Sequence, residues 1–218
     1  MERLRASGHF RPTVIGSGPT PGAYERWGKR ACDLLGAAAL LVLLAPVLGG
    51  VALAVRLALG SPVLFRQVRA GRGGRPFTLL KFRSMAEGPG EDAARLCRFG
   101  RALRASALDE LPQLVNVLRG EMSLVGPRPL PMDYLALYTP RQRERLRMRP
   151  GLTGLAQAEG RNGVPWERRL DLDARYAARQ TLAGDVALLL RCLWVVLRGQ
   201  GVTAPGHATM PRFRGNRD

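Results

Sequence analysis

The chain of 218 residues is long enough for one domain with a small appendage, and 46% hydrophobic residues can bury an ordinary core. This composition excludes an intrinsically disordered protein. The 34 Lys and Arg against 17 Asp and Glu give a formal net charge of +17, which predicts anionic partners. Nucleic acid, acidic lipid headgroups and phosphorylated small molecules all satisfy that prediction, and charge alone does not choose among them.

The positions of the cysteines and histidines argue against several common chemistries. Cys32, Cys97 and Cys192 are odd in number and far apart, which supports neither a disulfide framework nor a zinc site and indicates a reducing compartment. His9 and His207 lie near the two ends of the chain, which disfavours Ser-His and Cys-His catalysis. The remaining candidates are carboxylates and cations, with or without a metal ion.

The N-terminal quarter divides into a polar and an apolar segment. Residues 1–23 are rich in Arg, Gly, Pro, Ser and Thr, so we predict a flexible cytosolic tail. Residues 34–55 are apolar and uncharged, and at about 1.5 Å per residue a helix of this length just reaches across a bilayer. Pro46, followed by Gly49 and Gly50, predicts a break near the middle of this helix.

Cations flank the apolar segment on both sides. They are Arg26, Lys29 and Arg30 before it, and Arg56, Arg66, Arg69, Arg72 and Arg75 after it. Because cytoplasmic loops carry an excess of Lys and Arg, both ends are expected in the cytoplasm. We therefore predict a re-entrant helix-break-helix over residues 24–60, with a kinked full span as the alternative.

Two short β-leaning runs follow the apolar segment. They span Val63–Arg69 and Pro76–Arg83, and a Gly-rich loop separates them, which predicts a small hairpin. On the second strand Lys81 and Arg83 share one face and could hold adjacent phosphate oxygens. A solvated edge strand is the alternative.

The rest of the chain is predicted to be mainly helical. We expect amphipathic helices near residues 96–103 and 138–149, the second densely basic and suited to anionic lipid headgroups, and two closing helices over 166–180 and 185–197. A Gly-rich loop between them presents Arg161 and Asn162. The predicted fold class is mainly α with a small β-hairpin (α+β), in a monotopic membrane protein with interfacial amphipathic helices. Residues 61–218 are the predicted cytoplasmic catalytic domain.

The most informative stretch runs from Leu108 to Pro129. Asp109 and Glu110 begin an amphipathic segment, and Pro112 favours a first helical turn, so Asp109 is expected near a helix N-terminus with a low pKa. A carboxylate there could attack phosphorus while its neighbour holds magnesium, because adjacent helical residues diverge by about 100°. An ordinary N-cap at Asp109 is the alternative.

A rigidly held arginine follows the acid pair. Arg128 lies between two prolines, which restrict the backbone and leave the guanidinium little entropy to lose on binding an anion. Arg104, five residues before Asp109, could reach the same cavity.

Several ordered motifs together resemble the bacterial sugar transferase family, the monotopic phosphoglycosyl transferases. They are Lys29–Leu34, Pro46, Lys81–Met85, Leu108–Leu114, Asn116–Pro129, Arg149–Gly154 and Gly160–Asn162. The resemblance covers nearly everything from Trp27 to Gly215. One departure is Ala45, where the family often has serine before the membrane proline.

The resemblance implies transfer of a sugar 1-phosphate from a UDP-sugar to undecaprenyl phosphate, with release of UMP, as the first membrane step of glycan assembly at the cytoplasmic face of the bacterial inner membrane. It also implies that Asp109 is the nucleophile and that Glu110 helps bind Mg²⁺. It assigns the binding of phosphates or nucleotide to Lys81, Arg104, Arg128 and Arg161. Asp185 matches a family acid of less certain role, and we include it among the substrate-binding candidates with Arg83 and Asn162.

Two other classes remain open on the sequence. A membrane-tethered basic nucleic-acid-binding protein would need aromatic side chains among the basic patches, but aromatic residues are only 6% of the chain, so nucleic acid is not an expected partner. A scaffold without catalytic activity is the second. The sequence does not specify the oligomeric state or the donor sugar.

Overall fold

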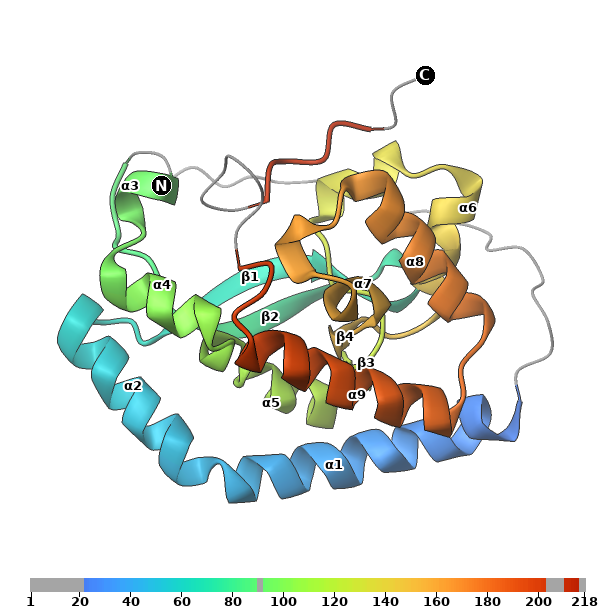
Figure 1. Cartoon of the computed structure of the whole chain (residues 1–218), viewed down its shortest axis with the longest axis horizontal. Coiled ribbons are helices and arrows are strands. Elements are labelled where there is room, and N and C mark those ends of the chain that lie inside the picture. Colours follow the sequence, from blue (N-terminus) through green and yellow to red (C-terminus); the bar gives the residue numbers. More distant parts are fainter. Residues whose placement is uncertain (1–21, 90–91, 203–209, 216–218) are drawn as a thin grey trace.

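A computed structural model describes residues 22–89, 92–202 and 210–215 (Figure 1). The predicted tail of residues 1–23 lies outside the described part, apart from Gly22 and Ala23. A short π-helix, Tyr24–Gly28, leads into the first α-helix. The helices are α1 (Lys29–Leu43), α2 (Ala45–Leu59), α3 (Asp92–Arg95), α4 (Arg98–Ala105), α5 (Gln113–Arg119), α6 (Pro140–Arg143), α7 (Leu155–Ala158), α8 (Trp166–Ala178) and α9 (Leu182–Leu197). The strands are β1 (Leu64–Ala70), β2 (Pro76–Phe82), β3 (Ser123–Val125) and β4 (Gly151–Thr153).

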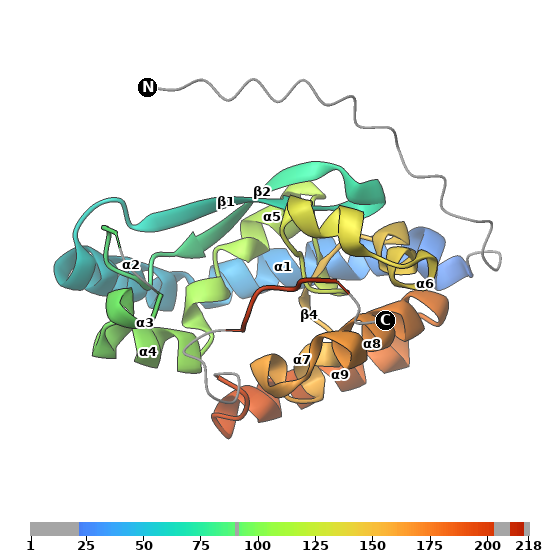
Figure 2. The same cartoon turned by 90° about the horizontal axis from the view of Figure 1, so that it is seen from above.

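The predicted α+β class is confirmed, and so is the hairpin. Strands β1 and β2 pair antiparallel, with Phe65 opposite Lys81 and Arg69 opposite Phe77. A second pair, β3 with β4, is parallel and was not predicted. Each of these strands has only three residues, too few for alternation to identify them. In the view of Figure 2 the hairpin lies along one side and α8 and α9 along the other, with α5 between them.

One face of α1 anchors this helix to the rest of the fold. Lys29, Asp33 and Ala37 are buried and recur every four residues, so they share a face. The carboxylate of Asp33 accepts hydrogen bonds from the Ser123 hydroxyl and the Leu124 amide, both at 2.9 Å. The start of α1 is thereby tied to β3.

Four buried clusters build the core of the described chain, one of them formed by Ala156, Val164 and Leu172. The largest joins α1, α5 and the two sheets and includes Ala37, Leu79, Leu114, Val117, Met122, Leu124, Val125, Met148 and Tyr176. A second surrounds Tyr134, Tyr138 and Phe213, and a third packs Val55 of α2 against Phe82 and Leu103. The third cluster fixes the far end of α2 against the hairpin.

Helices α1 and α2 meet at a sharp bend. The bend lies at Leu44, so Pro46 occupies the first turn of α2, where its missing N–H costs nothing. Within the described ranges no helix alone is long and apolar enough to cross a bilayer. Tyr24–Leu43 and Ala45–Leu59 meet that test only together, and they are bent by 64°.

The basic run at 138–149 differs from the single interfacial helix expected there. Helix α6 ends at Arg143, a 3₁₀ turn covers Glu144–Arg147, and the chain is extended at Met148. Arg145 is only 4% exposed, because its guanidinium turns inward to Asp173. The run therefore does not present one continuous basic face.

Candidate active site

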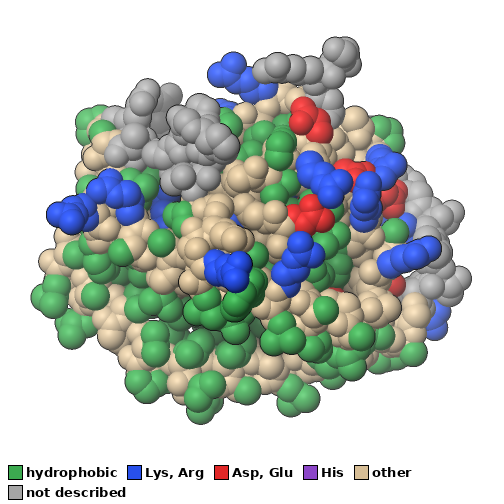
Figure 3. Space-filling view, viewed as in Figure 1, with side chains coloured by type: hydrophobic (Ala, Val, Ile, Leu, Met, Phe, Trp, Pro, Cys, Tyr) green, Lys and Arg blue, Asp and Glu red, His purple; other side chains and the backbone are tan. Residues whose placement is uncertain are grey.

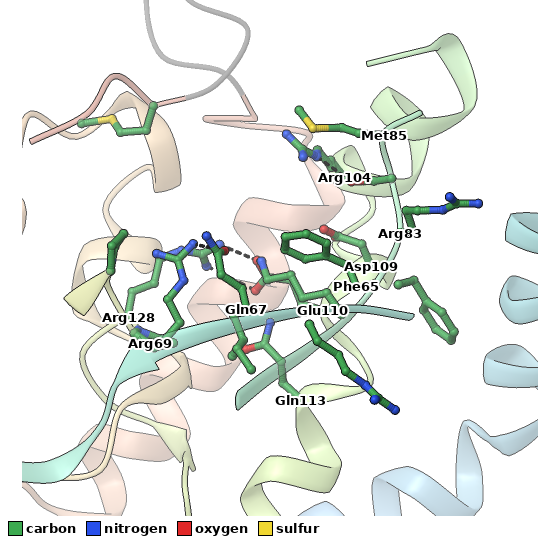
Figure 4. Close-up of a pocket in the computed structure, with 18 of the residues that line it drawn as sticks. Phe65, Gln67, Arg69, Arg83, Met85, Arg104, Asp109, Glu110, Gln113 and Arg128 are labelled. Carbon is green, nitrogen blue, oxygen red and sulfur yellow. Dashed lines mark hydrogen bonds and ion pairs between the residues drawn. The ribbon is translucent and has the colours of Figure 1, made fainter. Parts of the chain in front are cut away.

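A cavity of about 1080 Å³ opens beside the hairpin (Figure 4). Its wall comes from β1, the end of β2, α4, the turn at Leu108–Glu110, the segment around Arg128 and the turn at Arg161–Gly163. The predicted residues that line it are Lys81, Arg83, Arg104, Asp109, Glu110, Arg128, Arg161 and Asn162. The fold thus gathers side chains that lie up to about eighty positions apart.

The acid pair lies in a tight turn and not at a helix N-cap. Ala107 has a left-handed conformation (φ 57°), Leu108–Glu110 forms a 3₁₀ turn, and Pro112 precedes the first residue of α5. Asp109 accepts no capping hydrogen bond, so the N-cap alternative is wrong. A non-glycine residue at positive φ is uncommon, and here it turns the two carboxylates toward the cavity.

Glu110 is held by two cations. Its Oε1 accepts a hydrogen bond from Lys81 Nζ at 2.7 Å, and its Oε2 accepts one from Arg128 Nη1 at 3.2 Å. A second bond, from Arg128 Nη2 to Oε1, makes the arginine contact bidentate. Burial opposes ionisation of Glu110, but the charges of Arg128 and Lys81 outweigh it and hold the pKa of this carboxyl below its ordinary value.

Asp109 has the opposite environment. It is 6% exposed, and within the described part of the chain its carboxylate forms no hydrogen bond or ion pair. Burial raises the pKa of Asp109 above its ordinary value, against the opposing charges of Lys81 and Arg104. The expected low pKa is therefore wrong, because among the described residues no helix N-terminus donates to this carboxylate and no cation forms an ion pair with it.

The cations around the pair have distinct partners. Lys81 contacts Glu110, whereas Arg83 donates to Glu87 at 3.0 Å and to the Leu59 carbonyl. Both side chains line the cavity, and their joint binding of adjacent phosphate oxygens stays a prediction. Arg104 donates from Nε to the Ser84 hydroxyl at 2.8 Å.

The backbone next to Arg128 is hydrogen-bonded within the parallel strand pair β3–β4. The Gly126 amide donates to Thr153 and the Gly151 amide donates to Pro127, at 2.8 and 2.9 Å. Arg145 adds a bond from Nη2 to the Arg128 carbonyl at 2.6 Å. The arginine is thus fixed from both sides of its backbone, in agreement with the restriction expected from its two flanking prolines.

Arg161 and Asn162 also line the cavity. Arg161 (φ 50°) donates to the carbonyls of Ala105 and Arg104, at 3.2 and 2.9 Å. Asn162 donates from its side chain to the Val202 carbonyl at 2.9 Å. The Arg161 bonds join the turn to the end of α4, and the Asn162 bond joins it to the segment after α9.

Asp185 is the predicted site residue that the fold does not bring to the cavity. It is buried, and its carboxylate accepts bonds from Lys29 at 2.6 Å, Tyr24 at 2.7 Å and Tyr176 at 2.6 Å. The contacts tie α9 to α1 and α8. The predicted substrate contact has no support from this placement, because the fold pairs Asp185 with a lysine far away in the sequence.

Sequence reasoning missed several polar side chains of the cavity wall. They include Gln67, Arg69, Gln113 and Arg169. A signal existed for two of them, because Phe65, Gln67 and Arg69 alternate on β1 and therefore share the face that pairs with Lys81. Gln113 and Arg169 lie on helices whose inward faces the sequence does not identify.

The acid pair offers part of the donor set that magnesium prefers. Among the described residues no group of three or more Asp, Glu, His or Cys side chains gathers. Asp109 has free lone pairs, and Oε2 of Glu110 accepts a single bond from the described side chains. Because Mg²⁺ commonly takes one or two protein carboxylates together with phosphate oxygens, the pair fits an ion that binds with a diphosphate.

A buried carboxylate that has no partner among the described residues and lies near several cations in a wide cavity fits an enzyme that transfers a phosphate-linked group. Comparison with known proteins defines the class. Residues 24–199 match the family described as bacterial sugar transferase. The chain therefore belongs to the bacterial sugar transferase family and is an enzyme of that class.

Three relatives illustrate this membership. The uncharacterized sugar transferase EpsL of Bacillus subtilis (strain 168) is 44% identical over 87% of this chain and 97% of its own length. The UDP-glucose:undecaprenyl-phosphate glucose-1-phosphate transferase of Caulobacter vibrioides is 43% identical over 82% of this chain and 73% of its own length. The undecaprenyl-phosphate galactose phosphotransferase of Salmonella typhimurium is 35% identical over 81% of this chain, which spans 42% of that relative.

Proposed function

We propose that this protein transfers a sugar 1-phosphate from a UDP-sugar to undecaprenyl phosphate through a covalent intermediate on Asp109. The observation that carries the proposal is the state of this carboxylate, which is buried, without a partner among the described residues and close to the charges of Lys81, Arg104 and Arg128. Two relatives whose names specify undecaprenyl-phosphate sugar-phosphate transfer support the choice of substrates.

In the first step a carboxylate oxygen of Asp109 attacks the phosphorus that bears the sugar. A bond forms between this oxygen and phosphorus, and the bond from phosphorus to the bridging oxygen breaks, so UMP leaves with the electron pair. Arg128 and Lys81 offset the negative charge of the phosphate oxygens, which would otherwise repel the attacking carboxylate.

In the second step a phosphate oxygen of undecaprenyl phosphate attacks the same phosphorus. The acyl-phosphate bond breaks, Asp109 regains its carboxylate, and the product is a polyprenyl diphosphate sugar. Covalent catalysis of this kind divides one difficult transfer into two easier ones.

We propose Mg²⁺ as the cofactor, held by Glu110 and Asp109 together with phosphate oxygens. When bound, it would neutralise charge on the diphosphate. Glu110 suits this role because its pKa is held low, so it stays ionised across the working pH range.

We place the enzyme at the cytoplasmic face of the bacterial inner membrane, with α1 and α2 as a re-entrant pair and anionic lipids around it. In Figure 3 the hydrophobic side chains gather toward the lower edge of the molecule, where Figure 1 shows α1 and α2. The exposed apolar side chains of α1, α2 and α9 include Leu35, Val42, Leu43, Leu53, Leu57, Val186, Leu190, Leu193, Trp194 and Leu197. An apolar surface of this extent suits a lipid acceptor that stays in the bilayer. The reaction would begin the assembly of a membrane-linked glycan.

The proposal is tested with the purified full-length protein in lipid nanodiscs, with magnesium, undecaprenyl phosphate and a panel of UDP-sugars. We expect UMP release with at least one donor and, without acceptor, one labelled sugar phosphate per protein on Asp109. Asp109→Asn should abolish both, whereas Asp133→Asn, at a side chain 47% exposed, should leave them unchanged. Chelation of the metal should stop turnover and added Mg²⁺ restore it. Absence of UMP with every donor would refute the proposal.

A further inference from the structure

Arg169 is a buried arginine that has no acid partner among the described residues. It lies on α8 and lines the cavity, yet it is only 4% exposed and forms no ion pair within the described chain. Its Nη2 donates to the Arg161 carbonyl at 2.6 Å, and its guanidinium stacks over Trp166 with 5.1 Å to the ring centroid. Its Nε is buried and has no acceptor among the described residues. A buried charge is normally paired, so this one is free to receive an anion.

Arg69 repeats the pattern on the hairpin side. It projects from β1 into the same cavity, donates to Gln67 at 2.5 Å, and also has a buried Nε without an acceptor in the described chain. Among the described residues it too forms no ion pair. Figure 4 shows Arg69 beside Arg128 and Gln67, on the side of the cavity away from Arg104.

Arg69 and Arg169 both lie near Arg128, whose charge acts on each of them, and Tyr134 acts on Arg69. Tyr134, which lines the cavity, packs edge-on against Trp166, with ring centroids 5.6 Å apart, and Arg169 stacks on that tryptophan. Burial, and then the charge of Arg128, lower the pKa of both Arg69 and Arg169 to about 10. Each guanidinium is thus destabilised by burial and by a neighbouring cation, which a bound anion would relieve.

The surroundings of Asp109 differ from those of Arg69 and Arg169. The charges of Lys81, Arg104 and Arg128 act on Asp109, and Arg161 interacts with it as well, whereas the cation that acts on both Arg69 and Arg169 is Arg128. The phosphate under attack must lie against Asp109 and the cations that act on it. A second phosphate, joined to the first through one bridging oxygen, would lie beside Arg128 on the side away from Arg104, where Figure 4 shows Arg69.

We propose that Arg69 and Arg169 form the site for the phosphate monoester that leaves, the phosphate of UMP. The inference rests on the proposed function. It assigns residues to the UMP part of the donor, whereas the acid pair acts at the sugar phosphate. Arginine suits this role because its planar fork binds phosphate oxygens in a bidentate manner. Charge gathered there stabilises the departing group while the bond to phosphorus breaks.

The test measures UMP affinity of the full-length protein in nanodiscs by calorimetry. Loss of a hydrogen bond to a charged group predicts that Arg169→Gln and Arg69→Gln each weaken UMP binding by about 10- to 100-fold. Arg169→Lys, which keeps the charge, should recover part of the affinity. Arg168→Gln is the matched control, because that neighbour is 51% exposed, paired with Glu159 and outside the cavity. Thermal unfolding of each variant checks that it is folded.

Polyprenyl phosphate is also a phosphate monoester, so the same site could bind the acceptor instead of UMP. Single-turnover kinetics distinguish these two ligands. We expect Arg169→Gln to slow formation of the adduct from UDP-sugar. Slower discharge to acceptor with normal adduct formation would assign the site to the acceptor and overturn the proposal, as would unchanged UMP affinity in both glutamine variants. If the wild type binds UMP through these arginines but transfers no sugar phosphate, the proposed function fails and this site stands.

Discussion

Replacing Asp185 by asparagine should destabilise the protein and leave substrate binding unchanged. The Lys29–Asp185 pair joins α1 to α9 at 2.6 Å, and the two side chains are only 10% and 6% exposed. Tyr24 and Tyr176 donate to the same carboxylate. The asparagine side chain would preserve the shape but leave the Lys29 ammonium buried without a counter-charge.

Breaking a buried pair from one side costs about 3–5 kcal/mol, because the remaining charge is uncompensated. For a chain of this size that corresponds to a fall in melting midpoint of roughly 6–20 °C. Thermal unfolding of the full-length protein in nanodiscs measures it. The control is Asp171→Asn, since that carboxylate is 27% exposed and pairs with surface arginines, where a pair contributes about 0–1 kcal/mol.

A double variant separates charge from shape. Lys29→Met with Asp185→Leu removes both charges and should recover much of the lost stability, because replacing a whole buried pair by apolar residues is often neutral. An unchanged melting midpoint in Asp185→Asn, together with a raised KM for donor or acceptor, would refute this reasoning and restore the substrate-binding role.

The remaining predictions concern Asp109, the anchor of α1 and the parallel strand pair. Burial raises the pKa of Asp109, and the protonated carboxyl cannot attack phosphorus. As the pH falls, adduct formation should therefore decline already above the ordinary aspartate pKa of 3.8. A stopped-flow pH profile of UMP release that declines only below pH 3.8 would contradict this prediction. Asp33→Ala leaves the Leu124 amide without its side-chain acceptor, whereas the Ser123 hydroxyl keeps the Val125 carbonyl as acceptor. The change should cost about 1–3 kcal/mol in denaturant unfolding, and a loss below about 1 kcal/mol would be inconsistent. Gly151→Ala places a Cβ 2.0 Å from the Gly126 nitrogen and should lower the free energy of unfolding by about 1–3 kcal/mol. The control is Gly49→Ala, which has open space around it and should not destabilise the protein. Equal denaturation midpoints of the two variants would count against the β3–β4 packing.

Local structure was largely predictable, since it depends on neighbours in the chain. The hairpin was expected over Val63–Arg69 and Pro76–Arg83, and the strands span Leu64–Ala70 and Pro76–Phe82. The closing helices were expected near their observed positions, and the bend in the apolar segment falls within two residues of Pro46. The alternation of polar and apolar residues, the glycine-rich loops and the backbone restriction by proline each depend on a few neighbouring residues. The sequence alone is therefore enough to predict them.

Elements that depend on distant pairing were not predictable. Strands β3 and β4 are three residues long and exist because segments nearly thirty positions apart align. The basic run at 138–149 was expected as one helix, but Arg145 turns inward because Asp173 lies beneath it. No local pattern identifies such a partner.

The acid pair illustrates both what the sequence determines and what only the folded structure determines. From the amino-acid order alone it follows that Asp109 and Glu110 stand together, that Arg128 lies between prolines, and that the motifs are those of a sugar transferase. Which of the two carboxylates is free depends on the folded chain, which brings Lys81 and Arg128 onto Glu110 and leaves Asp109 buried without a partner among the described residues. Protonation and reactivity depend on charges within a few ångströms in space, and those charges come from residues far apart in the chain.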